Sequence, residues 1–143
     1  MFVAAAMLFH AGCDSGQKAA SVKPVAKSVD LTRFFPMTNR GDVKPLGNGN
    51  LPSGNMVHYK NGKQEYDLFL LKSSGNEAAA LIVFDFKGKL KDPKPIPHFG
   101  GYYGLDGEKK TFVFSKLAYV AGVVGLSEKD ADAIARDFAA RIH

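Results

Sequence analysis

The chain has few of the features that usually reveal what a protein does. Its 143 residues contain one cysteine, so no disulfide can form within the chain. The most apolar run, residues 2–9, is too short for a transmembrane helix, which needs about 20 residues. The net charge of +5 at pH 7 is too weak to indicate nucleic-acid binding, for which a clustered basic face is expected. These absences argue against a disulfide-stapled domain, a membrane-spanning protein and a nucleic-acid-binding protein.

The sequence also has little that is typical of catalysis or metal binding. The four histidines are scattered, and no cluster of His, Cys or Asp has the spacing of metal ligands. No serine stands in a Gly-x-Ser-x-Gly motif. Glu65 and Asp67 lie two apart on an expected strand, so we predict that both face solvent as structural acids. The sequence therefore predicts no catalytic residue, no metal site and no cofactor.

The single cysteine, Cys13, directly follows the apolar run and two small residues, Ala11 and Gly12. A short apolar core that ends in small residues is typical of a signal peptide. This arrangement resembles the N-terminal signal of bacterial lipoproteins, and the resemblance covers residues 1–14 only. It implies cleavage before Cys13 and lipid attached to that cysteine, which would anchor the protein on the periplasmic face of the bacterial cell envelope. The alternative is an ordinary cleaved signal, or a disordered apolar N-terminus, with a free thiol that has no role.

Composition divides the chain into three parts. Residues 1–12 are the predicted signal peptide. Residues 13–30 hold the lipidated cysteine and a flexible tether of Ala, Ser, Lys and Val, which cannot bury enough apolar surface to order itself. A tether of this length spans roughly 20–25 Å. Residues 31–143 have the size of one domain.

The domain is predicted to be α+β, an antiparallel β-meander of five or six strands with one C-terminal helix packed on a face. Asn61-Gly62 and Asp106-Gly107 are hairpin signals between strand-like runs, and the first is expected to form a type I′ turn. Residues 38–55 are rich in Gly, Asn and Pro and are expected to be a loop. The strands are expected at residues 56–59, 64–72, 78–87, 101–105, 110–115 and 117–124.

The C-terminal helix is the element with the clearest pattern. Ser127 is a good N-cap, and acidic residues cluster in the first turns, where the helix dipole favours them. One apolar stripe follows helical spacing, and it is expected to pack against the sheet. Its members are Ala131, Ile134, Ala135, Phe138, Ala139 and Ile142.

Two groups of residues are candidates for binding. Phe99, Tyr102 and Tyr103 lie among glycines, and aromatic side chains in loops are enriched at recognition sites. The alternative is that these rings close one end of the sheet. The basic run that contains Lys87, Lys89 and Lys91 could contact anionic lipid or an acidic partner, or it could protect an edge strand from aggregation. Both alternatives remain open for each group.

We therefore expect a non-catalytic binding or accessory module, anchored to the membrane through lipid, with an envelope protein as a possible partner. One alternative is a carrier of a small apolar ligand between the sheet and the helix, which would need a cavity of several hundred Å³. A second is a small hydrolase-like enzyme that uses His98, Tyr103 and Asp106.

The predicted lipid anchor can be tested at Cys13. The Cys13→Ala variant is expected to leave the membrane fraction, because the acyl chains supply most of the membrane affinity, about 0.8 kcal/mol per buried CH₂. Fractionation of cells that express the full chain, followed by immunoblotting, measures this directly. Equal partitioning of the two forms into membranes would exclude the anchor.

Overall fold

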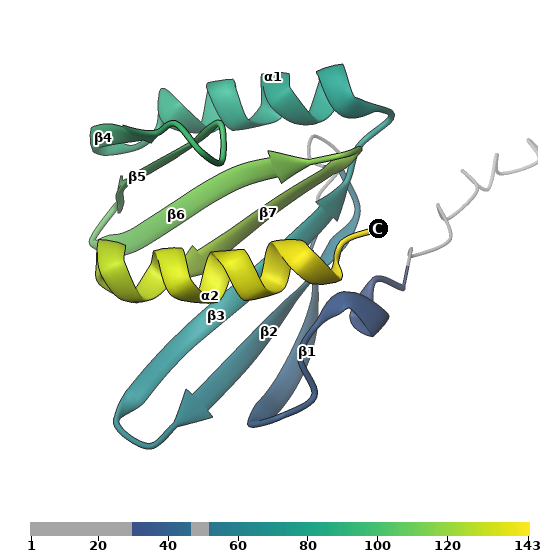
Figure 1. The fold of residues 1–143 in the computed structure, drawn as a ribbon, viewed down its shortest axis with the longest axis vertical. Helices are drawn as coiled ribbons and strands as arrows, with labels where there is room; N and C mark the ends of the chain where they lie inside the picture. Colours follow the sequence, from purple (N-terminus) through teal and green to yellow (C-terminus); the bar gives the residue numbers. More distant parts are fainter. Residues whose placement is uncertain (1–29, 47–51) are drawn as a thin grey trace, which may run out of the picture.

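The computed structural model describes residues 30–46 and 52–143. The predicted signal peptide, Cys13 and nearly all of the predicted tether lie outside the described residues. The described chain forms a seven-stranded antiparallel sheet and two α-helices (Figure 1). The strand order is β1-β2-β3-β7-β6-β5-β4. The strands are β1 (Arg40–Leu46), β2 (Gly54–Asn61), β3 (Gln64–Lys72), β4 (Lys91–Ile96), β5 (Gly101–Asp106), β6 (Lys109–Lys116) and β7 (Tyr119–Val124).

The sequence predicts one continuous meander, but the sheet combines two. Strands β1 to β3 form one meander, β4 to β7 form another, and the last strand, β7, pairs with β3 at the centre. The count of five or six strands is wrong, because two strands were not expected and one expected strand, over residues 78–87, is absent. The expected loop 38–55 contains β1, and residues 91–96, which include Pro93 and Pro95, form β4. Both are edge strands, the positions in a sheet where proline is tolerated.

The two predicted hairpins are confirmed, but their turns differ from the expectation. In the first hairpin Asn61 pairs with Gln64, so Gly62 is the first of two central residues and has a φ of 61°. Lys63, the second central residue, does not have positive φ, whereas a type I′ turn needs positive φ at both central residues. Gly107, with a φ of 63°, holds the same position in the second hairpin. Glycine at the first central position is typical of a type II′ turn.

The prediction of a strand over residues 78–87 is wrong, because this segment forms helix α1 (Asn76–Lys87). The run from Ile82 to Phe86 contains residues that favour strands, but a short apolar run cannot be assigned by its composition alone. Ala79 and Val83, four residues apart, are the buried pair that packs α1 on the sheet. Tertiary packing therefore overrides the local strand preference.

The C-terminal helix is confirmed as α2 (Glu128–Arg141). The Oγ atom of Ser127 accepts a hydrogen bond of 3.3 Å from the backbone N–H of Asp130, so the predicted N-cap is present. Ala131, Ala135, Phe138 and Ile142 of the predicted stripe are buried. They pack on the side chains of β3, β6 and β7 that point to one face of the sheet.

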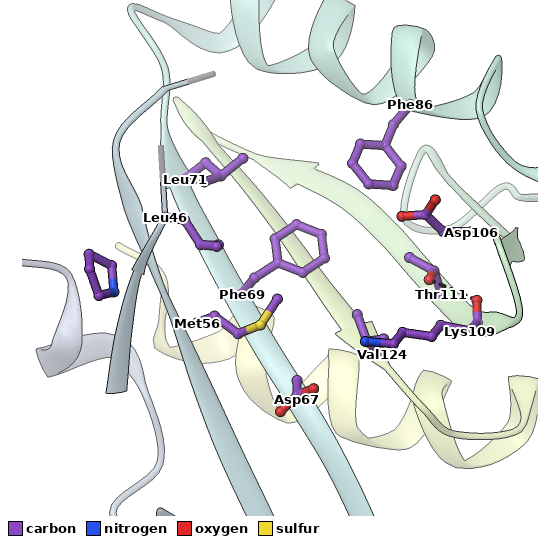
Figure 2. Close-up of a pocket in the computed structure, with 11 residues that line it drawn as sticks. Leu46, Met56, Asp67, Phe69, Leu71, Phe86, Asp106, Lys109, Thr111 and Val124 are labelled. Atoms are coloured by element: carbon purple, nitrogen blue, oxygen red, sulfur yellow. Dashed lines mark hydrogen bonds between the residues drawn. The ribbon is translucent and has the colours of Figure 1, made fainter. Parts of the chain in front are cut away.

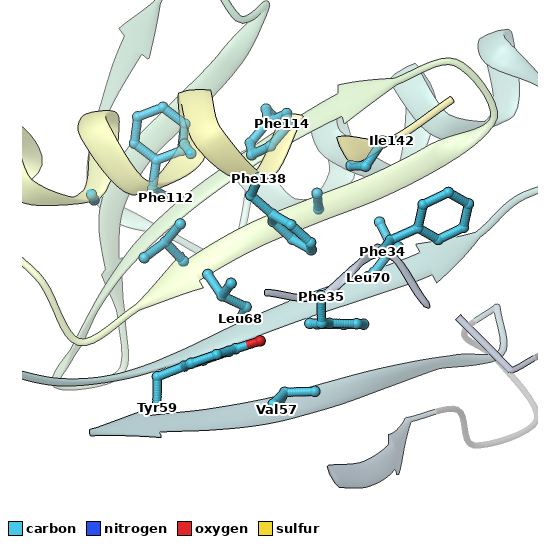
Figure 3. Close-up of a cluster of buried hydrophobic side chains, with 14 of the residues drawn as sticks. Phe34, Phe35, Val57, Tyr59, Leu68, Leu70, Phe112, Phe114, Phe138 and Ile142 are labelled. Atoms are coloured by element: carbon cyan, nitrogen blue, oxygen red, sulfur yellow. The ribbon is translucent and has the colours of Figure 1, made fainter. Parts of the chain in front are cut away.

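The face under α2 is covered along most of its width. α2 lies over β6 and β7, and the short 3-10 helix η1 (Thr32–Phe34) and Phe35 continue the cover toward β2. Figure 3 shows Phe34 and Phe35 pointing into the same cluster as Phe138, and the rings of Phe35 and Phe138 are 5.2 Å apart. Tyr59 donates a hydrogen bond of 2.8 Å to the carbonyl of Pro36, which fixes the end of this segment.

The opposite face is covered only in part. α1 packs on β5, β6 and β7, above a smaller cluster that includes Phe69, Leu71 and Val113. β3 is therefore buried on both faces along Leu68 through Leu71. Over β1, β2 and the start of β3, however, none of the described helices lies on the α1 side.

Candidate functional site

A groove lies on the open half of the sheet, beside helix α1 (Figure 2). Its volume is about 390 Å³, within the range of small-molecule sites. The floor and walls are mostly apolar. They come from β1, β2, β3, β7 and α1, through Pro45, Leu46, Met56, Phe69, Leu71, Phe86 and Val124.

Phe69 forms the centre of the floor, and its position depends on a glycine in the next strand. Phe69 pairs with Gly122 of β7. A Cβ atom at Gly122 would collide with the Phe69 ring and would lie 2.7 Å from the backbone oxygen of Phe112. The absence of a side chain there lets the ring lie against β7, where it stacks at 6.2 Å on Phe86 of α1. The floor of the groove is thus continuous with its α1 wall.

One end of the groove is polar. Asp67, Asp106, Lys109 and Thr111 gather there, near the β5–β6 turn (Figure 2). A second hollow of about 370 Å³ shares Met56, Asp67 and Lys109 with the groove and adds Asp42, Lys44 and His58. The two hollows therefore adjoin, and charges of both signs surround the place where they meet.

His58 connects two carboxylates at this polar end. Its Nδ1 atom lies 2.8 Å from Oδ1 of Asp67, and its Nε2 atom lies 2.8 Å from Oε1 of Glu65. The hydrogen bond to Asp67 is the main reason that the pKa of His58 is raised above its usual 6.5. Glu65 is exposed, as the sequence predicts, whereas Asp67 is partly buried, and both carboxylates contact a histidine on the neighbouring strand.

The three predicted aromatic residues do not form one site. Tyr102 lies on the α1 side of the sheet, whereas Phe99 and Tyr103 pack against the core under α2. The Phe99 ring is 4.8 Å from that of Phe114, and the Tyr103 hydroxyl donates a hydrogen bond of 2.9 Å to the carbonyl of Leu126. Phe99 and Tyr103 thus help to close one end of the sheet, which is the alternative that the sequence left open.

The predicted lysines are also divided among elements. Lys87 ends α1, Lys89 follows it, and Lys91 begins the edge strand β4. The Nζ atom of Lys87 lies 5.2 Å from the centre of the Tyr102 ring, so these two predicted binding residues do meet. The Nζ atom of Lys89 lies 5.9 Å from the centre of the Phe86 ring. Both side chains therefore lie over aromatic rings on the α1 side.

The residues of the hydrolase alternative are not brought together. Tyr103 and Asp106 are three residues apart on β5 and point to opposite faces of the sheet, because side chains alternate along a strand. His98 lies on the α2 side, where its Nε2 atom is 2.7 Å from Oδ1 of Asp132. The Arg136 guanidinium binds the same carboxylate and is the main cause of the lowered pKa of Asp132.

Sequence reasoning missed most residues that line the groove. Met56 and Phe69 were treated as ordinary strand positions, and Phe86 was assigned to a strand instead of a helix. The sequence of β3 did contain a usable signal. Asp67, Phe69 and Leu71 lie on one face of the strand, and the residues between them form a second face that is also apolar. Two apolar faces on one strand indicate cover on both sides of the sheet.

Within residues 30–46 and 52–143 there is no group of three or more His, Cys, Asp or Glu side chains that could hold a metal ion. In the same residues, no helix combines the length and apolar character that crossing a membrane requires. No protein-family model matches the chain, and neither a curated protein nor a solved structure is significantly similar to it.

The His58 cluster predicts a pH dependence of stability. Because the folded-state pKa of His58 is raised, its stabilising effect is complete below about pH 6.5 and is lost as the pH rises through that folded-state value. The free energy of unfolding of the wild type minus that of His58→Gln should therefore decrease from about pH 5.5 to about pH 8.5. The decrease should stay under about 1 kcal/mol, because the side chains are partly exposed.

Urea unfolding of both proteins at the two pH values measures this difference. If the difference between wild type and His58→Gln is the same at both, the histidine does not bind the two carboxylates as described.

Proposed function

We propose that the protein is a non-catalytic binding module of the bacterial cell envelope, anchored to a membrane through lipid on Cys13. We further propose that it takes an amphipathic small molecule into the groove beside α1. The single observation that supports this ligand most strongly is the division of the groove into a large apolar floor and a charged end.

The size and lining of the groove support an amphipathic ligand. An alkyl or aromatic group would contact Met56, Phe69 and Phe86, and its burial would contribute about 25 cal/mol per Å² of apolar area. A polar group would lie near Lys109 and Asp67, where donors and acceptors are both available. Few polar groups around an apolar floor are typical of small-molecule sites, in which the polar groups fix the ligand's orientation.

A head group that carries both charges fits the polar end best. Lys44 and Lys109 can bind an anionic group, and the carboxylates of Asp42 and Asp106 can bind a cationic one. Asp67 already contacts His58, so it has less capacity for a ligand than the other acids. We therefore propose a zwitterionic amphiphile with one apolar chain as the ligand class.

This proposal changes the location of the predicted carrier site. The sequence pointed to a cavity between the sheet and the C-terminal helix, but Phe138 on that helix is 0 % exposed and tightly surrounded. The groove lies beside the other helix, α1, on the open half of the sheet. The hydrolase alternative has less support, because His98, Tyr103 and Asp106 are not assembled around one cavity.

Filling the groove should weaken ligand binding. In the full chain with Cys13→Ala, dodecylphosphocholine below its micelle concentration is the probe, and isothermal titration calorimetry measures its affinity. Met56→Trp places a large ring over the apolar floor and should weaken binding at least about tenfold, or 1.4 kcal/mol.

The matched control is Val43→Trp. Val43 is a partly exposed residue that pairs with the buried Val57, on the side of the sheet opposite the groove. This control should bind like the parent chain. Absence of saturable binding to the parent, or equal loss in both variants, would reject the groove as the ligand site.

A further inference from the structure

Helix α1 presents apolar side chains to solvent as well as to the sheet. Ala79 and Val83 are buried against the sheet, and Ile82 and Phe86 pack at the border of the same cluster. Leu81 and Phe84 point away from that contact, with 64 % and 61 % of their surface exposed. They are three residues apart and therefore lie on one face of the helix. We call this pair, together with Lys87 and Lys89, the α1 ridge.

Helix α2 of the same protein has a largely polar solvent-exposed face, which serves as a comparison. The exposed positions of α2 include Lys129, Arg136 and Asp137. Arg136 binds Asp132, one turn away on the same helix. α1 differs from α2 in that two large apolar side chains, Leu81 and Phe84, are exposed on it, beside the acids Glu77 and Asp85. Clustered exposed apolar residues with polar neighbours mark interaction sites more often than isolated ones do.

The C-terminal end of α1 carries positive charge beside the apolar pair. The Nζ atom of Lys87 lies 5.7 Å from the centre of the Phe84 ring, and Lys89 and Lys91 follow along the chain. The acids nearest in sequence are Asp85 and Asp92, so lysines outnumber them at this end. An apolar face with lysines at its border suits the surface of an anionic bilayer, where apolar residues enter the interface and each lysine adds electrostatic attraction.

We propose that the α1 ridge docks on an anionic lipid bilayer, with Leu81 and Phe84 inserted at the interface and Lys87 and Lys89 among the head groups. This inference rests on the proposed function, because the predicted tether would hold the domain within about 20–25 Å of the membrane. Docking through α1 would also bring the groove wall formed by Phe86 next to the bilayer that can supply an amphiphile.

A second copy of the chain is a less suitable occupant. A stable dimer buries about 800 Å² on each partner. One exposed phenylalanine and one exposed leucine supply only part of that area, since an aromatic side chain buries about 150–250 Å². A bilayer needs no matching surface, so two side chains and a few lysines are sufficient when a lipid anchor contributes the rest.

The chain contains no tryptophan, so a single substitution provides a local reporter. In the full chain with Cys13→Ala, Phe84→Trp should shift its emission to shorter wavelength with phosphatidylglycerol–phosphatidylcholine vesicles and not with pure phosphatidylcholine vesicles. The matched control is Met37→Trp, at a position that is 76 % exposed in the segment on the opposite side of the sheet. Its emission should not change with either vesicle.

Two further variants of the Phe84→Trp chain separate the contributions. Lys87→Gln with Lys89→Gln should weaken vesicle binding roughly 30-fold, because each lysine near the surface contributes about 1 kcal/mol. Leu81→Gln should weaken it by about tenfold, because its side chain no longer gains from burial in the interface. Both substitutions are at the surface, and circular dichroism verifies that the variants are folded.

Three results would overturn the proposal. These are an unchanged Phe84→Trp spectrum, an equal shift in the Met37→Trp control, and a shift that depends on protein concentration in the absence of vesicles, which would indicate a second copy. None of them bears on the anchor or the groove, because the chain in this experiment carries no lipid and the groove is tested by calorimetry.

Discussion

The width of the sheet is the constraint on which the rest of the structure depends. Seven strands offer two broad faces, and both helices pack over the same strands, β6 and β7. On the α2 side, Leu31, Phe34 and Phe35 extend the cover toward β2. On the α1 side, the described residues include no such segment. The apolar residues of that half include Met56 and Phe69. They therefore line an open groove instead of a closed core.

Because the two faces of the sheet are covered unequally, α1 has three roles. Its inner face packs on the sheet through Ala79 and Val83, its side contributes Phe86 to the groove, and its outer face carries Leu81 and Phe84. Exposed apolar side chains that cluster on one helix often mark an interaction site, and the sheet covers α1 on one side only. The proposed ligand and the proposed bilayer are the two environments that would cover the other sides.

Sequence patterns predicted the elements whose signals are local. Ser127 and the stripe that contains Phe138 identified α2, and the glycines at 62 and 107 identified two hairpins. The groove could not be predicted, because it depends on which helix covers which strands. Residues 78–87 show why: their apolar run fits a buried strand or a buried helix, and only the Ala79–Val83 contact with the sheet decides. Because that run was predicted to be a strand, Phe86 was not predicted to line the groove.

The central claim is that the α1 side of the sheet is half covered and half open. Thiol reactivity tests it most directly, because the chain has one cysteine, which Cys13→Ala removes. In that background, the account predicts that Met56→Cys, in the groove, reacts rapidly with a thiol reagent in the folded protein. Val113→Cys, which is on the same face but buried under α1, should react only on unfolding. Equal protection of the two cysteines would contradict the account.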